Sequence, residues 1–429
     1  MQLRYNFRLY PTAGQRESLA RAFGCARTVF NDGLRLRHEA REQGLPYVSD
    51  GDLSKRLITE AKKTPERAWL GEVSAVLLQQ ALADLNTAYR NFFASATGRR
   101  KGPQMAPPRF RSRKDSRQSI RFTKNAKFKV TPAGRLRLPK IGDVPVRWSR
   151  RLPSQPSSVT VTKDTAGRYF ASFVVQTSDE PLPEVSSEVG VDLGLTHFLV
   201  TSDGRKVDNP RFLRRAERRL RKAQQSLARK EKGSQNRKKA VVKVARAHAK
   251  VADARRDHAH KLSTQLIRDN QAVYVENLSV SGLARTRLAK SVHDAGWSQF
   301  TTMLAYKATL HGRTFARIDR WFPSSRRCSA CGVIAGRMPL DVREWTCGCG
   351  VTHDRDHNAA KNILAAGRAE RRNACGDQAG PDSGPAPVVE AGTHSTLPAS
   401  AALQGRIPPV RREGCQDAGH ALEDRDGRS

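Results

Sequence analysis

The sequence predicts a multidomain protein of class α+β, and three observations lead to this prediction. The chain has 429 residues, more than the roughly 250–300 residues of one large hydrophobic core, so we expect about two to four domains. Residues 105–177 carry short apolar alternations between Pro- and Gly-rich turns, after two helical patterns. Beyond residue 183, strand and helix patterns alternate, and four cysteines are clustered.

The charge of the chain indicates a polyanionic partner. Its 77 Lys and Arg residues outnumber 41 Asp and Glu residues and give a formal net charge of +36. Such an excess of one sign repels itself in a compact state, and binding to a polyanion offsets it. Nucleic acid is the leading candidate. An anionic membrane surface comes second, because the most basic stretch, residues 211–268, has few of the aromatic residues that such a role needs.

The N-terminal half predicts one strand, two helices and a β-rich segment. Residues 3–10 alternate as a strand does, and T-A-G-Q at residue 12 is a capping-box pattern that starts a helix. A second apolar helical stripe covers residues 76–93. Two β-rich runs around residues 164–167 are typical of a hairpin. We expect residues 105–177 to form a small β-barrel, with the N-terminal strand as a candidate member.

The second half predicts alternating strands and helices. In chain order we expect two strands within 185–204, two basic helices within 211–268, a strand at 272–276, a helix at 297–311, a strand at 314–318 and a helix at 358–366. The basic helices are either a solvated surface pair or a pair that faces phosphates. The start of the chain has no signal-peptide pattern and no run of eighteen apolar residues occurs, so we expect a cytoplasmic protein.

Four of the seven cysteines lie close together and predict a zinc site. Cys328 and Cys331 form a C-x2-C pair, whereas Cys347 and Cys349 form a C-x-C pair that is one residue short. Two tight turns that each supply two thiolates are typical of structural zinc, and clustered cysteines in an intracellular chain favour a metal over disulfides. His353 is the alternative to Cys349 as fourth ligand, since imidazole also suits zinc.

Three separated carboxylates form a second candidate site. Asp192 and Glu276 each end an apolar strand, and Asp354 and Asp356 precede a helix that begins with small residues. Each carboxylate alone is explained as a turn, strand-end or helix-start charge. Together, their order is that of an RNase H-like nuclease core, in which oxygen ligands hold two Mg²⁺ ions about 4 Å apart for phosphodiester hydrolysis.

Several stretches together resemble a known family. They are FRLYPTAGQ, APPRFRSRKDSRQSIRF, GVDLGLTHFLVTSDG, GSQNRKKA, YVENLSVSGL, and WFPSSRRCSACG followed by WTCGCGVTHDRDHNAAKNIL. Over about residues 1–366 the chain resembles TnpB (OrfB), the transposon-encoded RNA-guided nucleases that are related to type V CRISPR effectors.

The resemblance implies a β-barrel wedge domain interrupted by a helical recognition domain, followed by an RNase H-like (RuvC-type) α/β nuclease domain with a zinc-ribbon insertion. The limits that we expect are 1–14 and 105–182 for the wedge domain, 15–104 for the recognition domain, 183–321 and 351–367 for the nuclease domain, which includes the basic helix pair 211–268, 322–350 for the zinc ribbon and 368–429 for a disordered tail.

The resemblance also implies the site residues. A catalytic, Mg²⁺-binding triad falls on Asp192, Glu276 and Asp356, and zinc falls on the four clustered cysteines. Asp356 is preferred to Asp354 because the last motif of the family, D-x-N-A-A, matches residues 356–360. The short second cysteine pair departs from the family pattern.

The function implied by the resemblance is an RNA-guided, Mg²⁺-dependent DNA endonuclease. It would act as a monomer with a guide RNA made from the transposon end, on double-stranded DNA beside a short target-adjacent motif. Two alternatives remain open. One is a catalytically silent, RNA-guided DNA-binding regulator, which the presence of all three carboxylates disfavours. The other is a transposase acting directly on DNA ends, which a nuclease core alone does not distinguish from the first.

Overall fold

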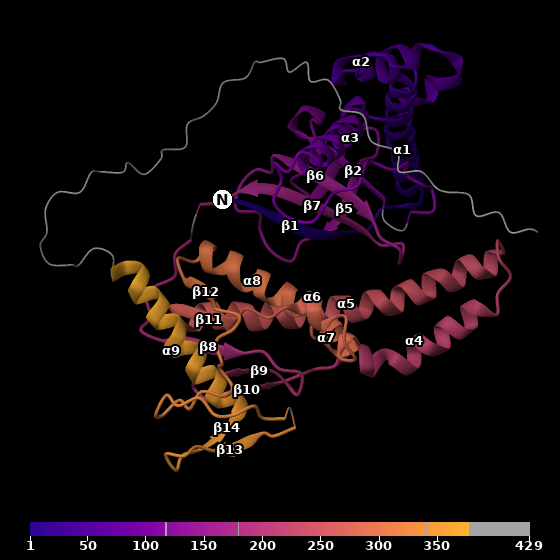
Figure 1. The fold of residues 1–429 in the computed structure, drawn as a ribbon. Coiled ribbons are helices and arrows are strands. Elements are labelled where there is room, and N and C mark those ends of the chain that lie inside the picture. Colours follow the sequence, from indigo (N-terminus) through magenta and orange to yellow (C-terminus); the bar gives the residue numbers. More distant parts are fainter. Residues whose placement is uncertain (116–117, 179, 340, 377–429) are drawn as a thin grey trace, which may run out of the picture. The chain divides into compact units, whose positions relative to one another are not determined.

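The structure is a computed structural model that describes residues 1–376, except for residues 116–117, 179 and 340. It is a mixed α/β protein with a curled seven-stranded sheet in the N-terminal half and a five-stranded sheet in the second half (Figure 1). Among the helices of the described part, none is long and apolar enough to cross a membrane. Most of the tail predicted at 368–429 lies outside the described residues.

The long first helix, α1 (Ala13–Glu42), begins at the predicted capping box. The hydroxyl of Thr12 accepts a hydrogen bond from the Gln15 backbone N–H (3.3 Å), and the Gln15 side chain accepts one from the Thr12 N–H (3.0 Å). The apolar side of α1 packs against α3 (Ala75–Ala96), where Gly33 allows the close approach of two leucines of α3. Between these helices lie α2 (Asp50–Ser54) and a run of π and 3₁₀ turns over residues 55–72.

The curled sheet has the strand order β2-β6-β7-β1-β5-β4-β3. Its strands are β1 (Gln2–Leu9), β2 (Gln118–Thr123), β3 (Lys129–Val130), β4 (Arg135–Leu138), β5 (Gly142–Arg147), β6 (Ser158–Lys163) and β7 (Tyr169–Gln176). The N-terminal strand pairs with β7 along its whole length and with the end of β5, so it belongs to this sheet. β6 and β7 form the predicted hairpin. Alternate residues such as Phe7, Phe122 and Phe173 point into one shared core.

The five-stranded sheet has the order β10-β9-β8-β11-β12. Its strands are β8 (Glu188–Asp192), β9 (His197–Thr201), β10 (Lys206–Asp208), β11 (Ala272–Glu276) and β12 (Thr314–Ile318). The neighbouring strands β8, β11 and β12 are parallel, whereas β9 is antiparallel to both of its neighbours, β8 and β10. Because parallel strands end at the same edge of a sheet, the carboxyl ends of β8 and β11 meet.

Helices cover both faces of the five-stranded sheet. Val273 and Val275 of β11 pack with α5 (Gln235–Asp269) and α8 (Trp297–Leu310), and Ala272 and Tyr274 pack toward α9 (Arg355–Gly376). Burial on both faces explains why β11 is a continuous apolar run. The remaining helices and strands are α4 (Phe212–Ala228), α6 (Val280–Leu283), α7 (Ala289–Ala295), β13 (Glu344–Thr346) and β14 (Thr352–Asp354), the last two forming a hairpin.

Helix α9 packs on the sheet at two glycines. A Cβ at Gly190 would lie 2.2 Å from the Ala360 carbonyl oxygen, and one at Gly367 would lie 2.1 Å from the Tyr274 ring. The helix continues to Gly376, so the predicted start of the tail at residue 368 is wrong. The cause is a pair of arginines in the last turns, because Arg368 and Arg371 make ion pairs of 2.6 and 2.7 Å with Glu188.

Candidate active site and metal centre

The predicted carboxylates Asp192 and Glu276 lie side by side at the edge of the five-stranded sheet. The parallel register pairs Val191 with Val275, which places the next residue of each strand, a carboxylate, at the same level. Asp356 lies in the first turn of α9. Because α9 contacts β8 at Gly190, its first turn reaches the end of that strand. The fold therefore brings together three residues that are far apart in the sequence.

The ionisation of Asp192 and Glu276 is shifted by burial and by their neighbours. Burial raises the pKa of Asp192 well above its ordinary value, and the charges of Glu276 and Asp356 raise it further. Burial also raises the pKa of Glu276, against the hydrogen bonds that it accepts. Three negative charges in partial burial repel one another, so ionising all of them costs free energy unless a cation is bound. This donor set of hard oxygens fits a divalent cation such as Mg²⁺.

Asp354, the alternative to Asp356, is engaged in structural contacts. Its carboxylate accepts a hydrogen bond from the His357 backbone N–H (2.8 Å), which caps the start of α9, and it pairs with Lys206 Nζ at 2.5 Å. Although partial burial opposes the shift, these two donors lower the pKa of Asp354. A capped and paired carboxylate is less available to a metal than the neighbouring Asp356, which supports the choice of Asp356.

Two further residues contact the carboxylates and were missed by the sequence reasoning. The Ser324 hydroxyl donates a 2.6 Å hydrogen bond to Glu276 Oε1. Arg343 donates to Asp356 Oδ1 (3.3 Å) and to Thr196 Oγ1 (3.2 Å). Ser324 lies in the quoted stretch WFPSSRRCSACG, and Arg343 directly precedes β13. Neither position has a residue type or spacing that marks a site without the fold.

Two asparagines of α9 connect the first cysteine turn to the sheet edge that carries the carboxylates. Asn358 accepts a hydrogen bond from the Ser329 backbone N–H (2.9 Å) and donates one to the Arg327 carbonyl (2.8 Å). Asn362 donates to the carbonyls of Arg327 (2.6 Å) and Ser324 (2.8 Å). Both side chains are buried. The position of Ser324, and through it that of Glu276, therefore depends on the same helix that carries Asp356.

The four predicted cysteines converge and fit a zinc ribbon. The Sγ atoms of Cys328, Cys331, Cys347 and Cys349 all lie within 4.8 Å of one another. Hydrogen bonding by the Cys331 backbone N–H lowers the pKa of the Cys328 thiol to about 5, whereas, against a backbone hydrogen bond with Val333, hydrogen bonds with the neighbouring sulfurs raise the pKa of the Cys331 thiol to about 12. A thiolate is the form that binds zinc. The short C-x-C turn of the second pair thus still brings its second sulfur to the cluster.

His353 lies beside this cluster. Its Nε2 is 3.0 Å from Cys328 Sγ, and the side chain is buried under the Trp345 ring, with the ring centroids 4.9 Å apart. This distance fits a hydrogen bond from the imidazole to the sulfur. Because four sulfurs are already present, we assign His353 a hydrogen bond to the sulfur of Cys328. We do not assign it the alternative role of fourth zinc ligand.

The basic helices α4 and α5 lie against each other and form a cationic groove. The groove has a volume of about 670 Å³ and is lined by alanines and by five cations, Arg215, Arg219, Lys243, Arg246 and Lys250. No acidic side chain is among its lining residues, and none of the five cations is ion-paired with another described residue. This arrangement fits the phosphate-facing prediction for the pair better than a solvated surface.

A second, smaller groove begins at the sheet edge that carries the carboxylates. Its volume is about 310 Å³, and Glu276 forms part of its lining together with Arg317, Arg320 and several hydroxyl side chains. Arg320 Nε donates to the Asn277 carbonyl at 3.4 Å. The cations and hydroxyls next to Glu276 are groups that can donate hydrogen bonds to phosphate oxygens.

Comparison with known proteins decides the family. A family model described as a probable transposase, OrfB of IS605, matches residues 172–287. A relative from Streptomyces pristinaespiralis, named "Putative RNA-guided DNA endonuclease", is 46% identical over 380 residues, which cover 87% of this chain and 90% of the relative. The chain belongs to the TnpB (OrfB) family. InsQ of Escherichia coli K12, which bears the same description, is 32% identical over 393 residues and is covered to 94%.

Two further family models match segments of this TnpB chain, and one solved structure is similar over most of it. A model named Cas12f1-like TNB domain matches residues 297–363, the region of the cysteine cluster. A model described as a helix-turn-helix domain matches residues 1–45, but in the structure these residues form strand β1 and the single long helix α1. A solved Cas12f1–sgRNA–target DNA complex is similar at 11% identity and a TM-score of 0.49, covering 85% of this chain and 98% of that one.

Proposed function

We propose that this TnpB protein is an RNA-guided, Mg²⁺-dependent DNA endonuclease that acts beside a short target-adjacent motif. The relatives named as RNA-guided DNA endonucleases support the general activity. The observation that carries the proposal is the meeting of Asp192, Glu276 and Asp356 at one sheet edge, where burial and neighbouring carboxylate charges raise the pKa values of Asp192 and Glu276. Carboxylates with such shifted pKa values are typical of functional sites.

In this proposal the three carboxylates hold Mg²⁺, which when bound polarises the phosphodiester and lowers the pKa of water. Ser324 orients Glu276 by its 2.6 Å hydrogen bond. Arg343, half-exposed and 3.3 Å from Asp356, is free to contact the substrate phosphate once a metal neutralises that carboxylate. The four cysteines hold zinc, which keeps the segment that carries Ser324 and Arg343 in place.

The cationic groove between α4 and α5 is assigned to the phosphate backbone of the RNA or of the heteroduplex that it forms. Its five unpaired cations would release condensed counterions on binding, which gives affinity without reading sequence. Sequence would be read by base pairing with the guide, as in other RNA-guided effectors. The smaller groove beside Glu276 would take the strand that enters the catalytic edge.

Co-purification tests the proposal. The protein is expressed with the DNA that flanks its gene, the bound RNA is sequenced, and the complex is incubated with Mg²⁺ and a plasmid library that carries a guide-matched target beside randomised bases. We expect one discrete RNA, and cutting that requires both the match and one short motif. A discrete RNA without cutting would favour a guided DNA-binding regulator.

A second candidate is a transposase that acts directly on DNA ends, and the description of the matching family model favours it. The same preparation separates the two functions. A transposase would join labelled transposon ends to a target plasmid in the absence of the RNA, whereas the proposed endonuclease would require the RNA and would join no ends.

A further inference from the structure

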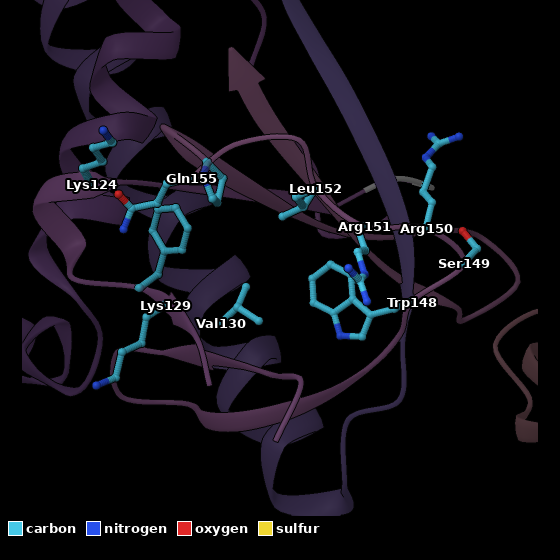
Figure 2. Close-up of a pocket in the computed structure, with 11 residues that line it drawn as sticks. Lys124, Lys129, Val130, Trp148, Ser149, Arg150, Arg151, Leu152 and Gln155 are labelled. Carbon is cyan, nitrogen blue, oxygen red and sulfur yellow. The ribbon is translucent and has the colours of Figure 1, made fainter. Parts of the chain in front are cut away.

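The curled sheet leaves a pocket between its two unpaired edges. Its terminal strands, β2 and β3, do not pair with each other. Between the segments next to these edges lies a pocket of about 910 Å³ (Figure 2). Its lining comes from three stretches of the chain, within residues 124–130, 148–152 and 155–156. The volume is within the range of sites that enclose small organic groups, roughly 300–1,000 Å³.

One wall of the pocket is a rigid aromatic ring. The Trp148 indole N–H donates to the Gly134 carbonyl (2.7 Å), and its ring packs against Phe7 and nearly parallel to Phe173, with centroids 4.6 and 5.6 Å away. Val130, 38% exposed, also borders the open space, as Figure 2 shows. Apolar side chains thus remain uncovered around a ring whose orientation is fixed.

The border of the pocket is cationic. Figure 2 shows Lys124 and Lys129 at one end and Arg151 beside Trp148 at the other, whereas the Arg150 side chain points away, with its guanidinium 4.6 Å from the centroid of the Tyr5 ring. No carboxylate is among the lining residues, and none of the four cations forms an ion pair within the part of the chain that the structure describes. A guest that matches this lining has a flat apolar body and more than one negative charge.

We propose that this pocket binds one unpaired nucleotide of the bound RNA, with its base against Trp148 and its flanking phosphates on the lysines and Arg151. Bases stack on aromatic side chains without regard to sequence, and cations hold the adjoining backbone. RNA is the occupant that we favour, because it presents unstacked bases in loops and bulges, whereas the proposed DNA target is double-stranded. The inference rests on the proposed function in so far as the protein carries an RNA.

Substitutions at the pocket border can block the pocket without disturbing the hydrophobic core. Replacing Trp148 would remove a core contact and a hydrogen bond, so it is a poor test. Val130→Trp adds a ring at an exposed position of the pocket border, and Arg151→Glu reverses one border charge. Arg135→Glu, at an exposed residue of β4 that does not line the pocket, is the matched control for charge.

The first measurement is the dissociation constant for the transcript of the flanking DNA at fixed salt. We expect Val130→Trp and Arg151→Glu each to weaken binding about tenfold, the size of one lost stacked base, and Arg135→Glu to weaken it about twofold or less. Tight binding by wild-type protein with no loss in Val130→Trp would overturn the pocket and leave the proposed function intact. No binding by wild-type protein would overturn both.

Photo-crosslinking locates the nucleotide independently. The transcript is made with 4-thiouridine, bound to the full-length protein and irradiated, and the crosslinked peptides are identified by mass spectrometry. We expect crosslinks to peptides that contain Val130 or Trp148, from one unpaired position of the RNA, and their loss in Val130→Trp. Crosslinks to these peptides from labelled target DNA alone would overturn the assignment to RNA.

Discussion

The thiolate cluster and the carboxylate cluster are linked by hydrogen bonds, but they differ in how far apart their residues lie along the chain. The four cysteines fall between residues 328 and 349, in two tight turns. The three carboxylates come from β8, β11 and α9. The thiolates are assembled by local turns, whereas the carboxylates meet only when the sheet and α9 are in place. The first set therefore depends mainly on its metal, and the second on the whole fold.

The sharpest test of the carboxylate set is Asp192→Asn. We expect DNA cleavage to fall by about a thousandfold or more, because one of three oxygen ligands and its charge are lost. The affinity for RNA should stay unchanged, since Asp192 is not among the residues that line the cationic groove. Cleavage is measured under single-turnover conditions with Mg²⁺. Near wild-type cutting would show that Asp192 is not part of the active site.

The same substitution has an opposite effect on stability. The folded-state pKa of Asp192 is raised. Ionisation of Asp192 therefore lowers the free energy of unfolding once the pH exceeds the unfolded-state pKa of about 3.9. In EDTA at pH 7, Asp192→Asn should therefore melt at a higher temperature than wild type, and the difference should shrink toward pH 4. Asp208→Asn, at a carboxylate whose side chain is 97% exposed, is the control and should show no gain.

Cys328→Ser tests the thiolate set. We expect zinc to be lost from the purified protein and the melting temperature to fall, because metal binding contributes directly to the folding of such small sites. Cys25→Ala is the matched control, since Cys25 is buried in α1, outside the cluster. It should keep the full zinc content. Equal zinc content in both variants would contradict the assignment of the ligands.

Ser324→Ala tests the connection between the two sets. We expect cleavage to fall roughly 10–100-fold, as is usual when a hydrogen bond that orients a metal ligand is lost, while zinc content and RNA affinity remain unchanged. The neighbouring Ser325, which is only partly buried, provides the control variant Ser325→Ala. If both variants cut at the wild-type rate, the 2.6 Å contact with Glu276 does not position that carboxylate.

A smaller effect is expected in the cationic groove. Arg246→Gln should reduce the slope of log affinity for RNA against log salt by about one, because one phosphate contact is lost. Lys261→Gln removes a cation of the same helix that is already paired with Asp257 at 2.8 Å. Its slope should stay close to that of wild type. Identical salt slopes in both variants would indicate that α4 and α5 are a solvated surface pair that does not face phosphates.

The smallest effect distinguishes the two neighbouring aspartates. Asp354→Asn should cost about 1 kcal/mol of stability through a weakened helix cap and ion pair, with cleavage changed far less than in Asp192→Asn. The folded-state pKa of Asp354 is lowered, so its contribution is present above an unfolded value of about 3.9 and is lost as the pH falls through the folded value. Melting curves at pH 7 and pH 3 measure this loss. A cleavage defect as large as that of Asp192→Asn would make Asp354 a metal ligand.

The sequence by itself determined the features that depend on local spacing. The capping box at Thr12, the β6–β7 hairpin and the cysteine pairs follow from residues a few positions apart, where turn and cap chemistry act directly. The apolar run of residues 272–276 likewise predicted a strand, and the net charge predicted a polyanionic partner. The order of the carboxylates suggested their meeting, because strand ends and helix starts are readable from pattern alone.

Tertiary structure alone decided which groups touch. The contact of Ser324 with Glu276, the contact of Arg343 with Asp356 and the pairing of Lys206 with Asp354 join segments whose distance in space no local pattern encodes. The end of α9 was misplaced for the same reason, because Glu188 lies on a strand far away in the sequence. Local backbone chemistry acts over a few residues, whereas these contacts depend on the packing of α9 against β8 at Gly190.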